Sequence, residues 1–181
     1  MSAFLLAAAT LAALGAWLDW RSGEIPNWLT LGALGLAPFA HLAYATSLGL
    51  TSNEAVMEAG FSGGGAALCA LVPLMLYRQN AIGGGDLKLL AALGAILQPR
   101  LGVEAEMYAF FSAALVAPAR LAYQGKLFVT LKNAVVLLVN PFLPKERRKE
   151  IEPETMSWFR FGPAIFFGTA LAVFLHWRKL R

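Results

Sequence analysis

The chain has 181 residues, of which 58% are hydrophobic and only 14% are charged. A typical soluble domain has about 45–50% apolar and about 25% charged residues, and a compact domain of this size cannot hide so much apolar surface, so the composition excludes an ordinary soluble globule. The net charge of +4 is spread between apolar stretches rather than gathered on one basic face, which argues against a nucleic-acid partner and for contact with membrane lipids.

Six apolar stretches follow one another, at about residues 3–18, 28–50, 55–77, 87–98, 103–123 and 161–177. A helix of about 20 residues crosses the hydrocarbon core, and about 17 can suffice. The fourth stretch is shorter, so we expect its helix either to extend through the residues around Pro99 or to sit in a locally thinned bilayer. A seventh run at residues 127–139 is too short to span comfortably and predicts an interfacial or re-entrant helix. The pattern therefore predicts an all-α polytopic membrane protein of about six transmembrane helices plus one interfacial helix, in a single membrane-embedded domain over residues 1–181.

The connections between these stretches predict an orientation. Basic residues gather in the first, third and fifth connections, whereas the second and fourth carry acidic residues and a single basic one, Arg100. An excess of Lys and Arg marks cytoplasmic loops. We therefore expect the odd-numbered connections to be cytoplasmic and both termini to lie outside, although a few basic residues at the C-terminus point the other way.

Aspartate occurs only twice, as Asp19 and Asp86, and both residues stand at the expected cytoplasmic end of an apolar stretch. A carboxylate at a membrane-embedded helix end is costly unless it is paired or functional. Two carboxylates that face each other can share a proton and activate a water for attack on a peptide carbonyl, as in aspartic proteolysis. The sequence does not say which of the two would be the acid and which the base.

Three glycines, Gly83, Gly84 and Gly85, precede Asp86. Glycine permits backbone angles closed to other residues and a close approach of a substrate strand to the main chain. Simpler interpretations stay open at this point: Asp86 as a helix N-cap after a flexible turn, and Asp19 as an interfacial charge paired with Arg21.

The residues around both aspartates resemble the type IV prepilin peptidases, membrane aspartic proteases of the GxGD kind. That family has an Asp followed by five residues and Ile-Pro-Asn, which is the spacing from Asp19 to the tripeptide 25–27 here. Its GxGD motif, with a Lys soon after, is matched by residues 83–88, and a late Gly-Pro motif is matched at Gly162-Pro163. The resemblance runs from residue 19 to 168 in the expected order.

The resemblance implies a membrane aspartic endopeptidase that removes the short basic leader from prepilins or pseudopilins, cutting after a glycine at the cytoplasmic face of the inner membrane. It implies Asp19 and Asp86 as the catalytic pair, without metal or cofactor. Pilus-assembly or secretion machinery is a further expected partner. Six more residues are expected to shape the loop or bind substrate: Gly83, Gly84, Gly85, Lys88, Pro26 and Asn27. Of these, Pro26 and Asn27 are expected to shape the loop and cap the helix that follows. Lys88 is expected to extend towards the interface, or else to lie near the two aspartates and influence their ionisation.

The chain departs from the longer members of the family in one respect. Those members carry an extra segment with paired CxxC zinc motifs, associated with N-methylation of the trimmed pilin, whereas this chain has one cysteine, Cys69. It is similar to the short Tad/Flp-type or archaeal-type form, and we expect no methylation. The alternative functions are a non-enzymatic membrane scaffold, a small transporter, or an intramembrane protease that cuts helices in general.

Overall fold

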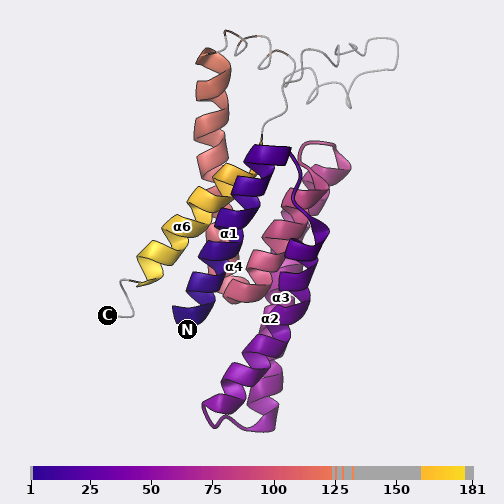
Figure 1. Ribbon diagram of the computed structural model, residues 1–181, viewed down its shortest axis with the longest axis vertical. Helices are drawn as coiled ribbons and strands as arrows, with labels where there is room; N and C mark the ends of the chain where they lie inside the picture. Colours follow the sequence, from indigo (N-terminus) through magenta and orange to yellow (C-terminus); the bar gives the residue numbers. More distant parts are fainter. Residues whose placement is uncertain (1, 124, 126–127, 129–131, 133–159, 178–181) are drawn as a thin grey trace. The chain divides into compact units, whose positions relative to one another are not determined.

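The computed structural model describes residues 2–123, 125, 128, 132 and 160–177, and this part of the chain contains helices and no strand (Figure 1). The helices are α1 (Ser2–Ser22), α2 (Asn27–Ser47), α3 (Ser52–Arg78), α4 (Gly84–Tyr123) and α6 (Gly162–Trp177). The prediction of an all-α chain is confirmed for the described residues. The interfacial helix expected at 127–139 lies almost wholly outside them.

The chain divides into two compact units, one formed by Met1–Ser112 with Arg160–Arg181 and the other by Ala113–Phe159. The first unit contains α1, α2, α3, α6 and α4 as far as Ser112, and the candidate site described below belongs to it. The expectation of a single domain over residues 1–181 stays a prediction.

Helix α4 doubles back on itself at Gln98, whose backbone angles of φ 61° and ψ 174° interrupt the helix. A Cβ added to Gly102 would lie 2.8 Å from the Cα of Gly94, whereas eight residues along a straight helix rise about 12 Å. The reversal is visible in Figure 1 as two legs of α4. The legs correspond to the apolar stretches at 87–98 and 103–123, so the expectation that the fourth helix might extend through Pro99 is wrong.

Side chains from two other helices hold this reversal in place. The amide nitrogen of Gln98 donates to the carboxylate of Glu58 at 2.7 Å and lies 3.3 Å from Nδ1 of His41. Nε2 of His41 donates to the carbonyl oxygen of Ile96 at 3.0 Å, and its ring stacks on Phe4 with 3.9 Å between ring centroids. A non-glycine residue rarely takes a positive φ, and these contacts stabilise it here.

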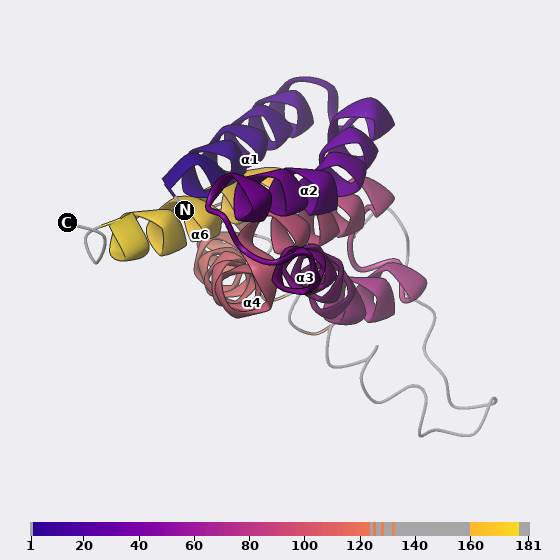
Figure 2. The ribbon, with the colours of Figure 1, turned by 90° about the horizontal axis from the view of Figure 1, so that it is seen from below.

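The first leg of α4 is the central element of the unit, because every residue from 89 to 97 is buried. Helix α3 meets this leg backbone to backbone: a Cβ on Gly65 would collide with the carbonyl oxygen of Gly94, and one on Gly94 would come within 2.7 Å of Cys69. Small residues permit such close helix packing in a bilayer. Helices α1 and α6 pack on each other, as do α2 and α3. Figure 2, seen from below, shows these helices around the first leg of α4.

Three helices, α1, α2 and α3, are long and apolar enough to cross a membrane, while α6 is apolar but shorter. Their outward faces carry large exposed apolar side chains such as Leu36, Phe39 and Met75, which suit contact with lipid rather than water. These features indicate a membrane protein. The number of about six spans and the orientation stay predictions.

Candidate active site

Asp19 lies in the last turn of α1, where the helix ends at Ser22 and Gly23 follows with a φ of 75°. The N–H of Gly23 donates to the carbonyl oxygen of Asp19 at 2.9 Å, a common way to terminate a helix with a left-handed glycine. The side chain of Asp19 is buried, and its Oδ2 accepts a hydrogen bond of 3.0 Å from the N–H of Gly162. Asp19 thus satisfies a free N–H at the start of α6.

Asp86 is the third residue of α4 and is also buried. Its Oδ2 accepts a 3.3 Å hydrogen bond from the N–H of Gly83, which precedes the helix, and this is one half of a capping box. Its Oδ1 is buried without a hydrogen-bond partner among the described residues. The interpretation of Asp86 as a capping residue therefore accounts for only one of its two oxygens.

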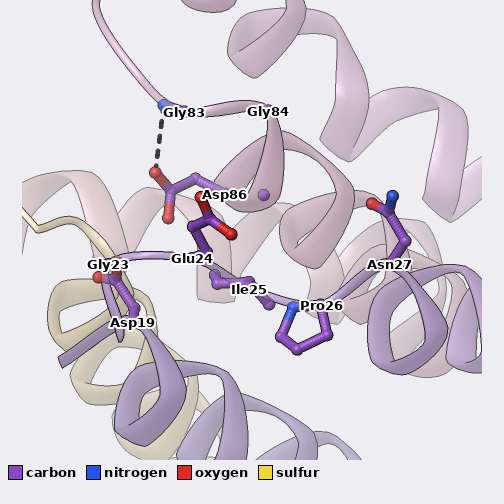
Figure 3. Close-up of a pocket in the computed structure, with 10 residues that line it drawn as sticks. Asp19, Gly23, Glu24, Ile25, Pro26, Asn27, Gly83, Gly84 and Asp86 are labelled. Atoms are coloured by element: carbon purple, nitrogen blue, oxygen red, sulfur yellow. Dashed lines mark hydrogen bonds between the residues drawn. The ribbon is translucent and has the colours of Figure 1, made fainter. Parts of the chain in front are cut away.

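The two carboxylates line the same cavity, which has a volume of about 330 Å³ (Figure 3). Two segments complete its lining: the connection from α1 to α2, and the glycines at 83–85, where α4 begins. Its lining residues are Asp19, Gly23, Glu24, Ile25, Pro26, Asn27, Gly83, Gly84, Gly85 and Asp86. A cavity of this size lies at the lower end of the range of ligand-binding pockets. The structure therefore brings both aspartates to one concave site.

The cavity perturbs the titration of Asp86, which lies outside the three helices that could cross a membrane. Burial and the nearby carboxylate of Asp19 raise the pKa of Asp86 from 3.8 to about 7, against the opposing effect of its hydrogen bond from Gly83. The charged form is disfavoured because a buried carboxylate loses hydration and is repelled by a like charge. A carboxyl group that titrates near neutral pH is suited to acid–base catalysis.

The glycines before Asp86 do not use special backbone angles, since none of the three has a positive φ, and that expectation is wrong. Gly84 and Gly85 belong to the first turn of α4. A Cβ on Gly85 would lie 3.1 Å from Cβ of Ile25, so the absence of a side chain lets the α1–α2 connection approach α4 closely. The glycines thus keep the two sides of the cavity together.

Two of the expected loop-shaping residues, Pro26 and Asn27, lie at the start of α2, and Lys88 lies near the start of α4. Pro26 is the N-cap residue of α2 but makes no side-chain cap, and Asn27 begins the helix without capping it. The side-chain oxygen of Asn27 instead accepts a 2.7 Å hydrogen bond from Nζ of Lys88. The expectation of a side-chain cap from Asn27 is therefore wrong. The two side chains tie α2 to α4, and the position of Lys88 at the membrane interface stays a prediction.

Three residues near the carboxylates were not assigned roles from the sequence. Glu24 lines the cavity, Gly162 donates to Asp19, and Arg160 donates to the carbonyl oxygen of Trp20 and places a positive charge near Asp19. The Gly-Pro pair at 162–163 marked Gly162 in the sequence, but no pattern linked Gly162 to Asp19.

The expected alternative partner of Asp19, Arg21, points elsewhere. Its guanidinium lies 5.5 Å from the ring centroid of Trp17, and the described part of the chain contains no ion pair between Arg21 and Asp19. Nor do the described residues include a group of three or more His, Cys, Asp or Glu side chains that could hold a metal ion.

Comparison with known proteins gives one match. The model of the type IV leader peptidase family matches residues 5–118. The matched region includes both aspartates and the glycine segment but ends before α6. No curated protein and no solved structure matches the chain.

Proposed function

The chain belongs to the type IV leader peptidase family, and from that membership we propose that it is a membrane aspartic endopeptidase that removes the short basic leader from prepilins or pseudopilins. One observation carries the proposal: two buried carboxylates from different helices line one cavity, and one of them keeps an oxygen without a partner among the described residues. Family membership supports the peptidase activity, and the pair of carboxylates supports the aspartic mechanism.

The proposed reaction uses Asp19 and Asp86 as a pair that holds one proton between them. The ionised carboxylate takes a proton from a water molecule, and the resulting hydroxyl attacks the scissile carbonyl. The protonated carboxyl group polarises that carbonyl, and a proton is later supplied to the leaving amine. Two like charges this close cannot both form cheaply, so a shared proton is the favoured state near neutral pH.

The substrate in this proposal enters the cavity from the cytoplasmic face of the inner membrane. The distribution of Lys and Arg between the connections supports that face, and the cut would follow a glycine just before an apolar helix. The glycine segment 83–85 and Asn27 line the cavity, and an extended peptide could lie there against the main chain. Pilus-assembly or secretion machinery is the expected setting, without nucleic acid or cofactor. With Cys69 as its one cysteine, the chain is proposed not to methylate the trimmed product.

The experiment is co-expression of a prepilin with the wild-type chain and with Asp19→Asn or Asp86→Asn. Asparagine keeps the size and polarity of aspartate but cannot carry the proton, so we expect each variant to lose trimming by at least about 100-fold. Glu104→Gln is the matched control, because Glu104 pairs with His176 near the far end of α6 and should trim normally. The amount of each variant in the membrane fraction shows whether it inserts.

Either Asn variant that trims near the wild-type rate would make that aspartate structural. In that case the non-enzymatic scaffold or small transporter becomes the better explanation of the two residues. Trimming of unrelated membrane helices at the same rate as prepilins would instead favour a general intramembrane protease.

A further inference from the structure

The two carboxylates of the cavity have unlike surroundings. Asp19 meets the N-terminus of a second helix, where Oδ2 accepts the N–H of Gly162 at 3.0 Å. The N-terminus of a helix carries a partial positive charge that stabilises a carboxylate within its first turn. Arg160, two residues earlier, adds a full positive charge near the same group. The burial of Asp19, which is the largest effect, opposes its ionisation, whereas the hydrogen bond from Gly162 and the charge of Arg160 favour it.

Asp86 receives much less stabilisation of its charge. Its bond from Gly83 is longer, at 3.3 Å, and its Oδ1 has no donor among the described residues although it is buried. The dipole of α4 does favour a charged Asp86, but burial and the charge of Asp19 outweigh it and raise the pKa of Asp86 to about 7. A buried carboxyl oxygen that accepts no hydrogen bond gains little from ionisation, so Asp86 is suited to carrying the proton.

The other charged groups around the cavity do not reverse this difference. Glu24 adds a further negative charge to the lining from the α1–α2 connection. Lys88, on the same helix as Asp86, is bound to the side-chain oxygen of Asn27. Arg21 lies over the ring of Trp17. Among the described residues, the cation that acts on either carboxylate is therefore Arg160, and it acts on Asp19.

We propose that the carboxylates have fixed and different roles, with Asp19 as the base that activates water and Asp86 as the acid that protonates the scissile carbonyl. The start of α6 at Gly162, together with Arg160 just before it, is the positioning element that sets this asymmetry. The assignment rests on the proposed peptidase function and deepens it.

The reaction balances with these roles. Asp19 takes a proton from water as the water oxygen bonds to the scissile carbon, while Asp86 gives its proton to the carbonyl oxygen, which produces a neutral diol. Asp19 then gives its proton to the leaving nitrogen as the C–N bond breaks, and Asp86 recovers a proton from a diol hydroxyl. The products are a carboxylic acid and an amine, and both aspartates return to their starting states.

The test is the pH dependence of kcat/KM for the full chain in lipid vesicles, with a peptide that carries a short basic leader, a glycine at the junction and an apolar helix. The acidic limb of the profile reports the base, and the alkaline limb reports the acid. Arg160→Gln removes the cation near Asp19, so the acidic limb should move to higher pH by roughly 0.2–0.7 pH units, the range for an exposed ion pair. The alkaline limb should stay in place.

Two matched variants separate charge from structure. Arg160→Lys keeps the charge and should restore the wild-type profile, and Arg21→Gln, which removes a cation from the same end of α1, should not move either limb. If only the alkaline limb moves in Arg160→Gln, the roles of Asp19 and Asp86 are reversed. If neither limb moves, the segment around the start of α6 is not the source of the difference between the two carboxylates. Absence of cleavage by the wild-type chain would overturn the peptidase function itself, which is a separate result.

Discussion

The high pKa of Asp86 makes a prediction about stability that is independent of catalysis. Replacement of Asp86 by Asn removes a group that the folded protein holds in an unfavourable charged state at high pH. We therefore expect Asp86→Asn to be inactive and yet more stable than the wild-type chain at alkaline pH.

The size of this stability effect follows from the difference in the pKa of Asp86 between the folded and the unfolded chain. The pKa of Asp86 is about 7 in the folded protein, compared with its ordinary value of 3.8, which we take for the unfolded chain. The folded state therefore holds the proton more tightly than the unfolded state does. The wild-type chain is then most stable below pH 4, loses stability as the pH rises from 4 to 7, and changes little above that. At about 1.4 kcal/mol for each pKa unit, the full loss is about 4 kcal/mol. Roughly 3 kcal/mol of it falls between pH 5 and pH 8.

The assay is thermal unfolding in detergent micelles, followed by the fluorescence of the chain's 5 tryptophans. The advantage of Asp86→Asn over the wild-type chain should grow between pH 5 and pH 8 by several degrees in Tm, roughly 6–12 °C at this chain length. The amide introduced by Asp86→Asn does not titrate, so its own effect on Tm is the same at both pH values and cancels in the comparison. Glu104→Gln provides the baseline for an acid-to-amide change outside the cavity. If Asp86→Asn had the same Tm advantage over the wild-type chain at pH 5 and at pH 8, the raised pKa of Asp86 would be refuted.

Four further substitutions have defined outcomes. Gly162→Ala places a Cβ 2.7 Å from Oδ2 of Asp19 and 2.8 Å from its Cβ, so it should lower kcat by at least about tenfold, with KM for the leader peptide nearly unchanged. Gly65→Ala forces a Cβ into the backbone of α4 and should lower the Tm through an overpacking cost of about 1–3 kcal/mol. Gly63→Ala, which meets nothing within 4 Å, should leave the Tm equal or raise it slightly. Glu24→Gln removes a charge from the cavity lining and should raise KM for a basic leader severalfold with kcat retained; an equal effect on a neutral leader would contradict this.

The sequence predicted the helices well because span length and apolar runs are local properties. Each of the six apolar stretches coincides with a described helix or with one leg of α4. The positions of Asp19 and Asp86 at the ends of two runs also predicted that both lie on one side of the membrane, whereas their shared cavity is seen only in the structure. These inferences needed no knowledge of which helices touch.

The sequence failed where a long-range contact decides the local structure. Gln98 takes a positive φ that its own chemistry disfavours, and bonds to Glu58 and His41 from other helices stabilise it. Asn27 looks like a capping residue, but Lys88 from α4 occupies its side-chain oxygen. Neither bond leaves a periodic signal, because the partners are 40 or more positions apart along the chain.

The hydrogen bond from Gly162 to Asp19 joins residues 143 positions apart, and this separation has a consequence for biogenesis. Ribosomes make α1 before α6, so Asp19 and Asp86 are both synthesised before the N–H of Gly162 that bonds to Asp19. A nascent chain that has emerged only to residue 118 would carry the whole region matched by the family model and would still lack this N–H. The surroundings of Asp19 are therefore complete only after synthesis has passed Gly162 and α6 has packed on α1.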